Sequence, residues 1–252
     1  MINVLICCYK AGDVLGYVLE QFVDVPEITR ILIADGPHTG GFGPHGYLVD
    51  EPSVKEVVDT FPQDKIFYEW TDDCEIRPDK NNRILPNVTE DCEWVLNVDA
   101  DEVYHEKYLR RLIGYLQKGP RYDRYCIQTV NPYPDHRHYF KIDDWKPRLY
   151  RYIEGMACPR GSDRQHQYIL HPDHKTKKGT IQGMAKMHPS KCQIYHLNSI
   201  RLLPVTGEEK CRVRPQDDGT LIYKGGKTFQ KTEIEPMSMK YVPHSIRKTL
   251  NE

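Results

Sequence analysis

Short apolar runs alternate with amphipathic stretches through the first half of the chain. Residues 2–8 and 30–34 are almost continuously apolar, as in strands buried on both faces of a parallel sheet. Between them, apolar residues at helical spacing over 14–22 predict a helix with one buried face, which Asp13 can cap and Pro26 ends. The opening of the chain therefore predicts one β-α-β unit.

The same alternation continues to about residue 120. We expect strands over 65–70 and 94–98, and helices over 53–60, within 71–91 and over 108–116. Alternating strands and helices are typical of a mostly parallel sheet covered by helices on both faces. The pattern predicts an α/β fold of this Rossmann-like kind.

The pattern becomes irregular in the second half. Strands are expected over 125–130, 148–153 and 192–196, separated by long intervals rich in Pro and His. Residues 202–252 show little periodicity, so we expect loops there with one short helix.

Composition narrows the class of protein. A hydrophobic content of 39% and a charged content of 28% describe an ordinary globular chain. A formal net charge of -1 provides no overall field for nucleic acid, so no nucleic-acid partner is expected. Eight scattered cysteines without a Cys-x-x-Cys pair favour free thiols in a reducing compartment over disulfides or a zinc site. The apolar run at the start is too short for a signal peptide or a transmembrane segment, so a cytoplasmic protein is expected.

Polar residues follow three of the predicted parallel strands, where ligands of doubly wound sheets bind. Cys8 and Tyr9 follow the first strand, Asp35 the second, and Asp99 and Asp101 the strand over 94–98. Side chains two residues apart in extended backbone point the same way, so both carboxylates can face one divalent ion such as Mg²⁺ or Mn²⁺, which binds diphosphates. An isolated Asp-x-Asp is more often a solvated turn or a helix cap. Here the motif directly follows a buried strand, and this position favours its interpretation as a metal site.

Three segments together resemble glycosyltransferase family 2. They are Cys8-Tyr9-Lys10, Ile33-Ala34-Asp35-Gly36 and the stretch from Trp94 to Glu102. The resemblance covers roughly residues 1–155. It implies the GT-A fold, a nucleotide-diphospho-sugar donor, a divalent metal ion and inversion at the anomeric carbon.

The resemblance also implies a division of the chain. Residues 1–121 would form the half that binds the nucleotide sugar, and residues 122–201 the acceptor side of the same domain. Residues 202–252 would be a C-terminal extension.

Individual roles are implied by the positions that match the family. Cys8 and Tyr9 match the segment that lines the nucleotide, and Asp35 lies in the segment that contacts the base. Asp99 matches the acidic residue near the ribose and the metal, and Asp101 the direct metal ligand.

Two positions depart from the family pattern after the second strand. Ala34 stands where an acidic residue is common, and Pro37 where a small polar residue is usual. Lys80 and Arg83 occupy the place of basic side chains that contact the donor, although a solvated helix face explains them equally well.

The catalytic base and the third metal ligand are less defined. An inverting transfer needs a base near the acceptor hydroxyl, and the candidates are Asp143, Asp144, Asp163 and His166, with Asp163 and His166 preferred. His196 resembles a late histidine of related enzymes, which would bind the metal or the diphosphate. A buried structural histidine is the alternative.

The sequence therefore predicts a metal-dependent glycosyltransferase that uses Mn²⁺ or Mg²⁺. A UDP-sugar is the default donor, and the acceptor would be a glycan, a lipid-linked or another hydroxyl compound. One alternative is a sugar-nucleotide nucleotidyltransferase, although the Gly- and Arg-rich loop typical of that class is missing after the first strand. The other is a non-catalytic nucleotide- or sugar-binding module on the same fold.

Overall fold

The computed structural model of the protein describes most of its first two thirds and shorter parts beyond. The described residues are 1–37, 52–132, 138–159, 184–188, 192–196, 213–215, 220–223, 227–230 and 234–236.

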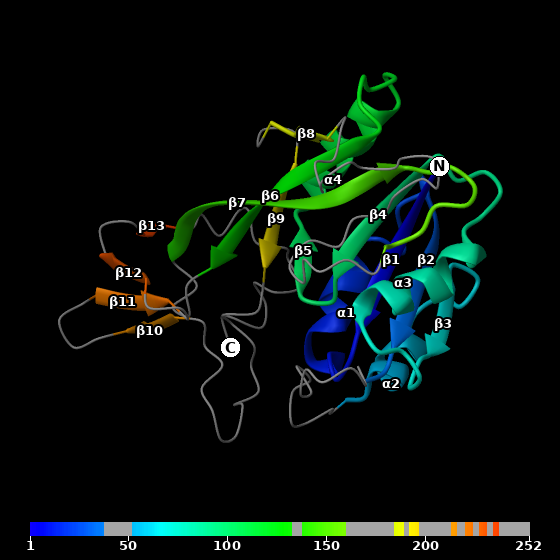
Figure 1. Ribbon diagram of the computed structural model, residues 1–252, viewed down its shortest axis with the longest axis horizontal. Helices are drawn as coiled ribbons and strands as arrows, with labels where there is room; N and C mark the ends of the chain where they lie inside the picture. The colour runs from blue at the N-terminus through cyan, green and yellow to red at the C-terminus, as the bar shows by residue number, and fades with distance from the viewer. Residues whose placement is uncertain are drawn as a thin grey trace.

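Four parallel strands form the half of the sheet built by the first hundred residues (Figure 1). They are β1 (Ile2–Cys8), β2 (Ile28–Asp35), β3 (Ile66–Trp70) and β4 (Trp94–Asp99). Their order is β3-β2-β1-β4. β2 and β3 therefore lie on one side of β1, and β4 lies on its other side. The carboxyl ends of β1, β2 and β4 therefore lie together, as the sequence predicts.

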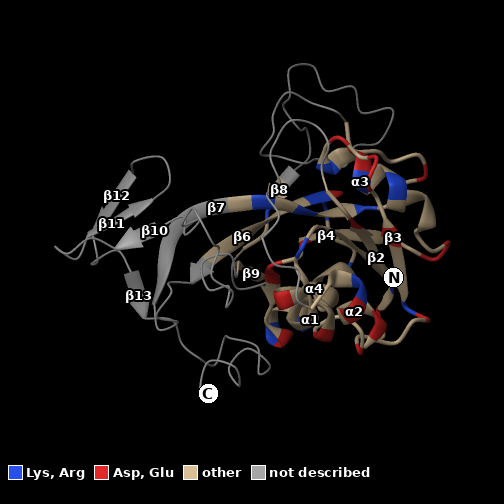
Figure 2. Ribbon diagram, turned by 90° about the horizontal axis from the view of Figure 1, so that it is seen from below, with Lys and Arg blue, Asp and Glu red and all other residues tan. Residues whose placement is uncertain are grey.

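Helices cover both faces of this half (Figure 2). They are α1 (Gly12–Glu20), α2 (Val54–Asp59), α3 (Arg77–Ile84) with the short 3₁₀ turn η1 (Leu85–Asn87), and α4 (Glu106–Leu116). Alternate residues of a strand point to opposite faces of the sheet and pack into two separate hydrophobic cores. Val4 and Ile6 pack with α1, α2 and α4, whereas Leu5 packs with α3 on the opposite face. The predicted α/β class with helices on both faces is confirmed.

Strands with mixed parallel and antiparallel pairing extend the sheet beyond β4. They are β5 (Glu102–Tyr104), β6 (Arg124–Pro132), β7 (His138–Arg151), β8 (Met184–Lys186) and β9 (Gln193–His196). The strand order runs β4-β7-β6-β9-β5, and β8 pairs with β6 outside this path. β5 follows β4 after only two residues of sequence, yet it is the last strand in this order. The sheet must therefore curl, so that β5 and its neighbour β9 lie near the carboxyl end of β4.

Residues 202–252 contain strands where loops and a short helix were expected, so that prediction was wrong. The strands are β10 (Val213–Pro215), β11 (Thr220–Tyr223), β12 (Lys227–Gln230) and β13 (Ile234–Pro236). β11 and β12 pair as a hairpin, and the sequence between them contains Gly225-Gly226. Runs this short show no clear periodicity, but β-branched and aromatic residues around a Gly-Gly pair are a hairpin signal.

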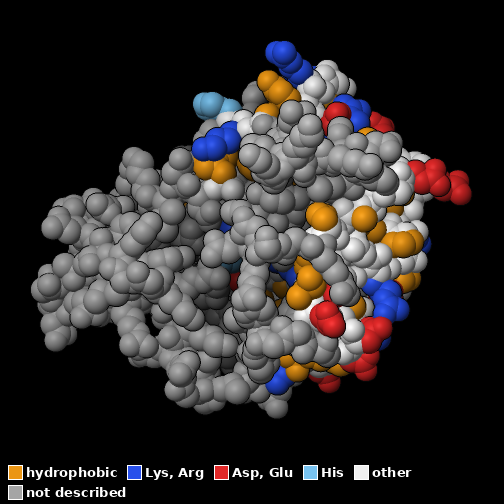
Figure 3. Space-filling view, in the orientation of Figure 1, with side chains coloured by type: hydrophobic (Ala, Val, Ile, Leu, Met, Phe, Trp, Pro, Cys, Tyr) orange, Lys and Arg blue, Asp and Glu red, His pale blue; other side chains and the backbone are white. Residues whose placement is uncertain are grey.

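Within the described residues, each helix is too short or too polar to cross a bilayer. Lys, Arg, Asp and Glu side chains are intermixed over the described part of the face in Figure 3. Among the described residues, a cluster of buried charged side chains lies at the end of β4.

Candidate functional site

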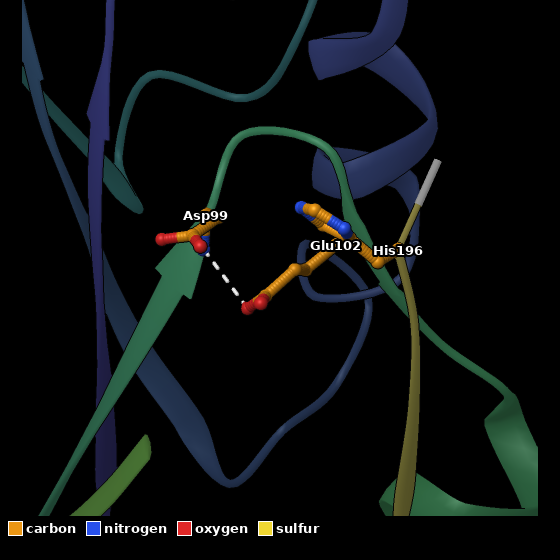
Figure 4. Close-up of side chains that lie close together, drawn as sticks. All are labelled: Asp99, Glu102 and His196. Atoms are coloured by element: carbon orange, nitrogen blue, oxygen red, sulfur yellow. Dashed lines mark hydrogen bonds between the residues drawn. The ribbon is translucent and has the colours of Figure 1, made fainter. Parts of the chain in front are cut away.

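The end of β4 carries the predicted metal motif in a tight turn. The backbone N–H of Asp99 donates to Glu102 Oε2 at 3.1 Å, which folds the turn back on itself. Ala100, between the two aspartates, is buried, which limits the space for a larger side chain there. Figure 4 shows Glu102 extending from β5 back toward the end of β4. Glu102, which is fully buried, is a site residue that was not predicted from the sequence.

His196 reaches the same turn from the far end of the strand path. β9 pairs antiparallel with β5, and His196 lies opposite Glu102. The imidazole Nε2 is 3.3 Å from Asp101 Oδ1. Burial would raise the pKa of Asp101, but the facing imidazole lowers it and the net shift is downward. Ligand atoms of Asp99, Glu102 and His196 also lie within 4.8 Å of one another, so four potential metal-ligating side chains converge here.

Three basic side chains surround Asp99. Arg148 Nη2 on β7 is 2.5 Å from Asp99 Oδ2 and 2.7 Å from Glu102 Oε1. Lys146, also on β7, lies 3.8 Å from Asp99 and 3.3 Å from Glu102. Arg77, the first residue of α3, forms an ion pair with the other Asp99 oxygen. The acidic motif is therefore enclosed by positive charge.

The pKa values of these groups reflect the enclosure. Burial would raise the pKa of Asp99, but Arg148, Arg77 and Lys146 outweigh it and hold this pKa well below its usual range. Burial would likewise lower the pKa of Arg148, and the two facing carboxylates raise it instead. Asp99 is thus held as a carboxylate.

These three basic residues had no role predicted from the sequence. Lys146 and Arg148 alternate along β7, and this spacing places them on one face of a strand. This alternation was the sequence pattern from which a shared basic face could have been predicted. Only the pairing of β7 with β4 shows that this face adjoins the aspartates.

Lys80 lies at the carboxyl ends of β1 and β2. It is fully buried, and its Nζ donates to the Cys8 carbonyl at 3.0 Å and to the Gly36 carbonyl. The Tyr9 ring centre is 6.0 Å from this ammonium group. Lys80 therefore fixes the two strand ends, and its predicted contact with a donor stays a prediction.

Asp35 and Arg83 have partners of their own. Asp35 is buried at the end of β2 and accepts a 2.9 Å hydrogen bond from the Tyr68 hydroxyl. Arg83, on α3, forms ion pairs with Asp73 and Glu69 on the surface. The structure thus brings Cys8, Asp35 and Lys80 together and directs Arg83 toward acidic neighbours.

The preferred candidates for the catalytic base, Asp163 and His166, lie outside the described residues. Asp143 and Asp144 lie within β7. All four assignments remain predictions.

Comparison with known proteins gives distant structural similarities. No family model matches the chain, and no curated protein matches it. A crystal structure of S. aureus TarS (fragment 1–349) aligns with a TM-score of 0.43 and 13% identity, over 60% of this chain and 46% of that one. The 4-diphosphocytidyl-2C-methyl-D-erythritol synthase from Anaerococcus prevotii aligns with a TM-score of 0.40 and 16% identity, over 60% and 70%.

The chain therefore spans less than half the length of the TarS fragment. The strand order and the charged cluster at the end of β4 define the candidate site.

Proposed function

We propose that this protein is a divalent-metal-dependent glycosyltransferase that moves a sugar from a nucleotide-diphospho-sugar to an acceptor hydroxyl. The observation that carries the proposal is the convergence of Asp101 and His196 beside Asp99, at the carboxyl end of a central parallel strand. This is the edge of the sheet at which α/β enzymes bind phosphorylated ligands.

The ligand set suits a divalent transition metal ion. Two ligand atoms about 2.1 Å from one octahedral ion lie roughly 3 Å apart, and the 3.3 Å between Asp101 and His196 is close to that spacing. Carboxylate oxygens suit Mg²⁺ and Mn²⁺, whereas an imidazole favours a transition metal. Mn²⁺ is therefore the ion we expect, with Asp101 and His196 as ligands and Asp99 beside them.

The protein's own residues supply the rest of the donor site. A bound Mn²⁺ would act as a Lewis acid toward the diphosphate leaving group. Lys80 holds the ends of β1 and β2 in place, so that Tyr9 and Asp35 stay in position for the nucleoside. UDP is the nucleotide we propose, and Asp163 or His166 the base that removes the acceptor proton.

Purified protein incubated with UDP-sugars and Mn²⁺ tests this function. Release of UDP that stops on removal of Mn²⁺ supports the proposal, and so does its loss in Asp101→Asn. Asp59→Asn, which changes an exposed aspartate paired with Lys55 on α2, serves as the matched control and should keep full activity. Release of pyrophosphate from UTP and a sugar 1-phosphate, added in place of the UDP-sugar, would identify a nucleotidyltransferase instead. Binding of UDP without turnover would identify a binding module.

A further inference from the structure

Three basic side chains form ion pairs with two carboxylates at the end of β4. Arg77, Lys146 and Arg148 face two carboxylates, those of Asp99 and Glu102. The remaining acidic residue of the turn, Asp101, is instead 3.3 Å from His196. Charges removed from water are costly unless they are paired, so three cations that share two carboxylates favour an additional anion.

The guanidinium groups also have more donors than their carboxylate partners use. Arg148 reaches both carboxylates through Nη2 alone. Its Nε, like that of Arg77, is buried without a hydrogen-bond partner among the described residues. Each guanidinium carries five N–H donors in a planar fork, which matches the oxygens of phosphate groups.

The three cations come from two different elements around one point. Arg77 is at the first turn of α3, while Lys146 and Arg148 share one face of β7. About a fifth of the Arg77 side chain and of the Lys146 side chain is exposed, whereas Arg148 is buried. An anion from solvent can therefore meet Arg77 and Lys146, the two partly exposed cations.

We propose that Arg77, Lys146 and Arg148 form the subsite for a diphosphate, and that Asp99 competes with this diphosphate for the same three cations. The inference rests on the proposed function, because it names the part of the donor that these residues bind. It gives Asp99 a role beyond metal binding. Its carboxylate neutralises the cations in the free protein and is displaced from them when the diphosphate binds.

Titration calorimetry with inorganic pyrophosphate, in EDTA so that divalent ions are absent, tests the competition. Asp99→Asn removes the competing charge and keeps a similar shape, so we expect it to bind pyrophosphate roughly tenfold more tightly than the wild type, equivalent to about 1.4 kcal/mol. A role in metal binding alone predicts no such gain. Unchanged or weaker binding by folded Asp99→Asn would overturn the proposal.

Lys146→Met provides a second test that does not depend on the stability of Asp99→Asn. We expect roughly tenfold weaker pyrophosphate binding, with partial recovery in Lys146→Arg. Arg151→Gln is the control, because Arg151 lies on the same strand but pairs with Asp123 and stacks on Trp94. Equal binding by wild type and folded Lys146→Met would also overturn the subsite.

The result is separable from that of the proposed function. If pyrophosphate binding shows the expected pattern but no UDP-sugar is turned over with Mn²⁺, the subsite stands and the glycosyltransferase proposal fails. If turnover occurs but Asp99→Asn gains no affinity for pyrophosphate, the subsite alone fails.

Discussion

The imidazole Nε2 of His196 lies 3.3 Å from Asp101 Oδ1, although the two residues are 95 positions apart in the sequence. Asp101 follows β4 directly, whereas His196 ends β9, which pairs with β5. The contact exists because Asp101 directly precedes β5, and β5 pairs with β9 so that Glu102 lies opposite His196. This pairing therefore assembles the proposed metal site.

Replacing His196 tests whether this contact is a metal site. If His196 binds the ion, His196→Gln should weaken Mn²⁺ binding at least about tenfold, because the amide is a poorer ligand for a transition metal. Isothermal titration with Mn²⁺ measures the change. His188→Gln, which alters an exposed histidine, should bind Mn²⁺ like the wild type. Equal Mn²⁺ affinity in His196→Gln would leave His196 as a structural histidine.

The local pattern of the sequence was enough to predict the first half of the fold. Continuous apolar runs predict β1 and β2, and helical spacing predicts α1 and α4, because each of these elements buries residues at its own period. The start of α1 differs slightly: Ala11 occupies the N-cap position, where Asp13 was expected. Such terminal shifts are small and leave the site unchanged.

Long-range pairing could not be predicted in the same way. β5 is only three residues long and was not predicted, because it directly precedes the helical pattern of α4. It nevertheless positions Glu102 and pairs with β9. The charges of Lys146 and Arg148 reach Asp99 only because β7 pairs with β4. Periodicity shows which residues of a strand share a face, but it does not show which strand lies next to it. The aspartates of the site were therefore predicted, whereas Lys146 and Arg148 were not.

Gly36 should be irreplaceable for a geometric reason. Its φ of +139° is a conformation that L side chains rarely adopt, and an added Cβ would lie 2.3 Å from the Thr71 carbonyl oxygen. We expect Gly36→Ala to lower the free energy of unfolding by more than about 2 kcal/mol. Gly114→Ala is the matched control on α4, where a Cβ meets nothing within 4 Å. It should raise the free energy of unfolding by about 0.5–1 kcal/mol, and urea unfolding measures both changes. Equal effects of the two substitutions would contradict this geometric reason.

Asn97 carries an unsatisfied amide in the middle of β4. The residue is fully buried, and neither its Oδ1 nor its Nδ2 has a hydrogen-bond partner among the described residues. Asn97→Leu replaces the amide by an apolar group of similar size, so the penalty of desolvating the amide is removed. We expect the free energy of unfolding to rise by about 1–3 kcal/mol, measured by urea unfolding. A loss of stability would show that the amide is satisfied by a partner that binds at this position.

The capping box at the start of α2 predicts a pH dependence of stability. Glu56 Oε2 accepts hydrogen bonds from the Ser53 backbone N–H at 2.8 Å and from its hydroxyl at 2.9 Å. The backbone bond first, and then the hydroxyl bond, lower the pKa of Glu56 below its usual value. A lowered folded-state pKa contributes stability that is complete above the unfolded pKa of about 4.3 and is lost as the pH falls through the folded value.

Glu56→Gln should therefore lose less stability than the wild type when the pH is lowered from about 5 to about 3. Ser53→Ala removes the hydroxyl bond but keeps the backbone N–H, so its pH dependence should lie between the two. It should also cost about 1 kcal/mol at neutral pH, because the Ser53 hydroxyl accepts from the Glu56 N–H as the N-cap. Urea unfolding at several pH values measures all three proteins. Parallel pH profiles for the wild type and Glu56→Gln would show that the bonds to Ser53 do not favour the charged form of Glu56 in solution.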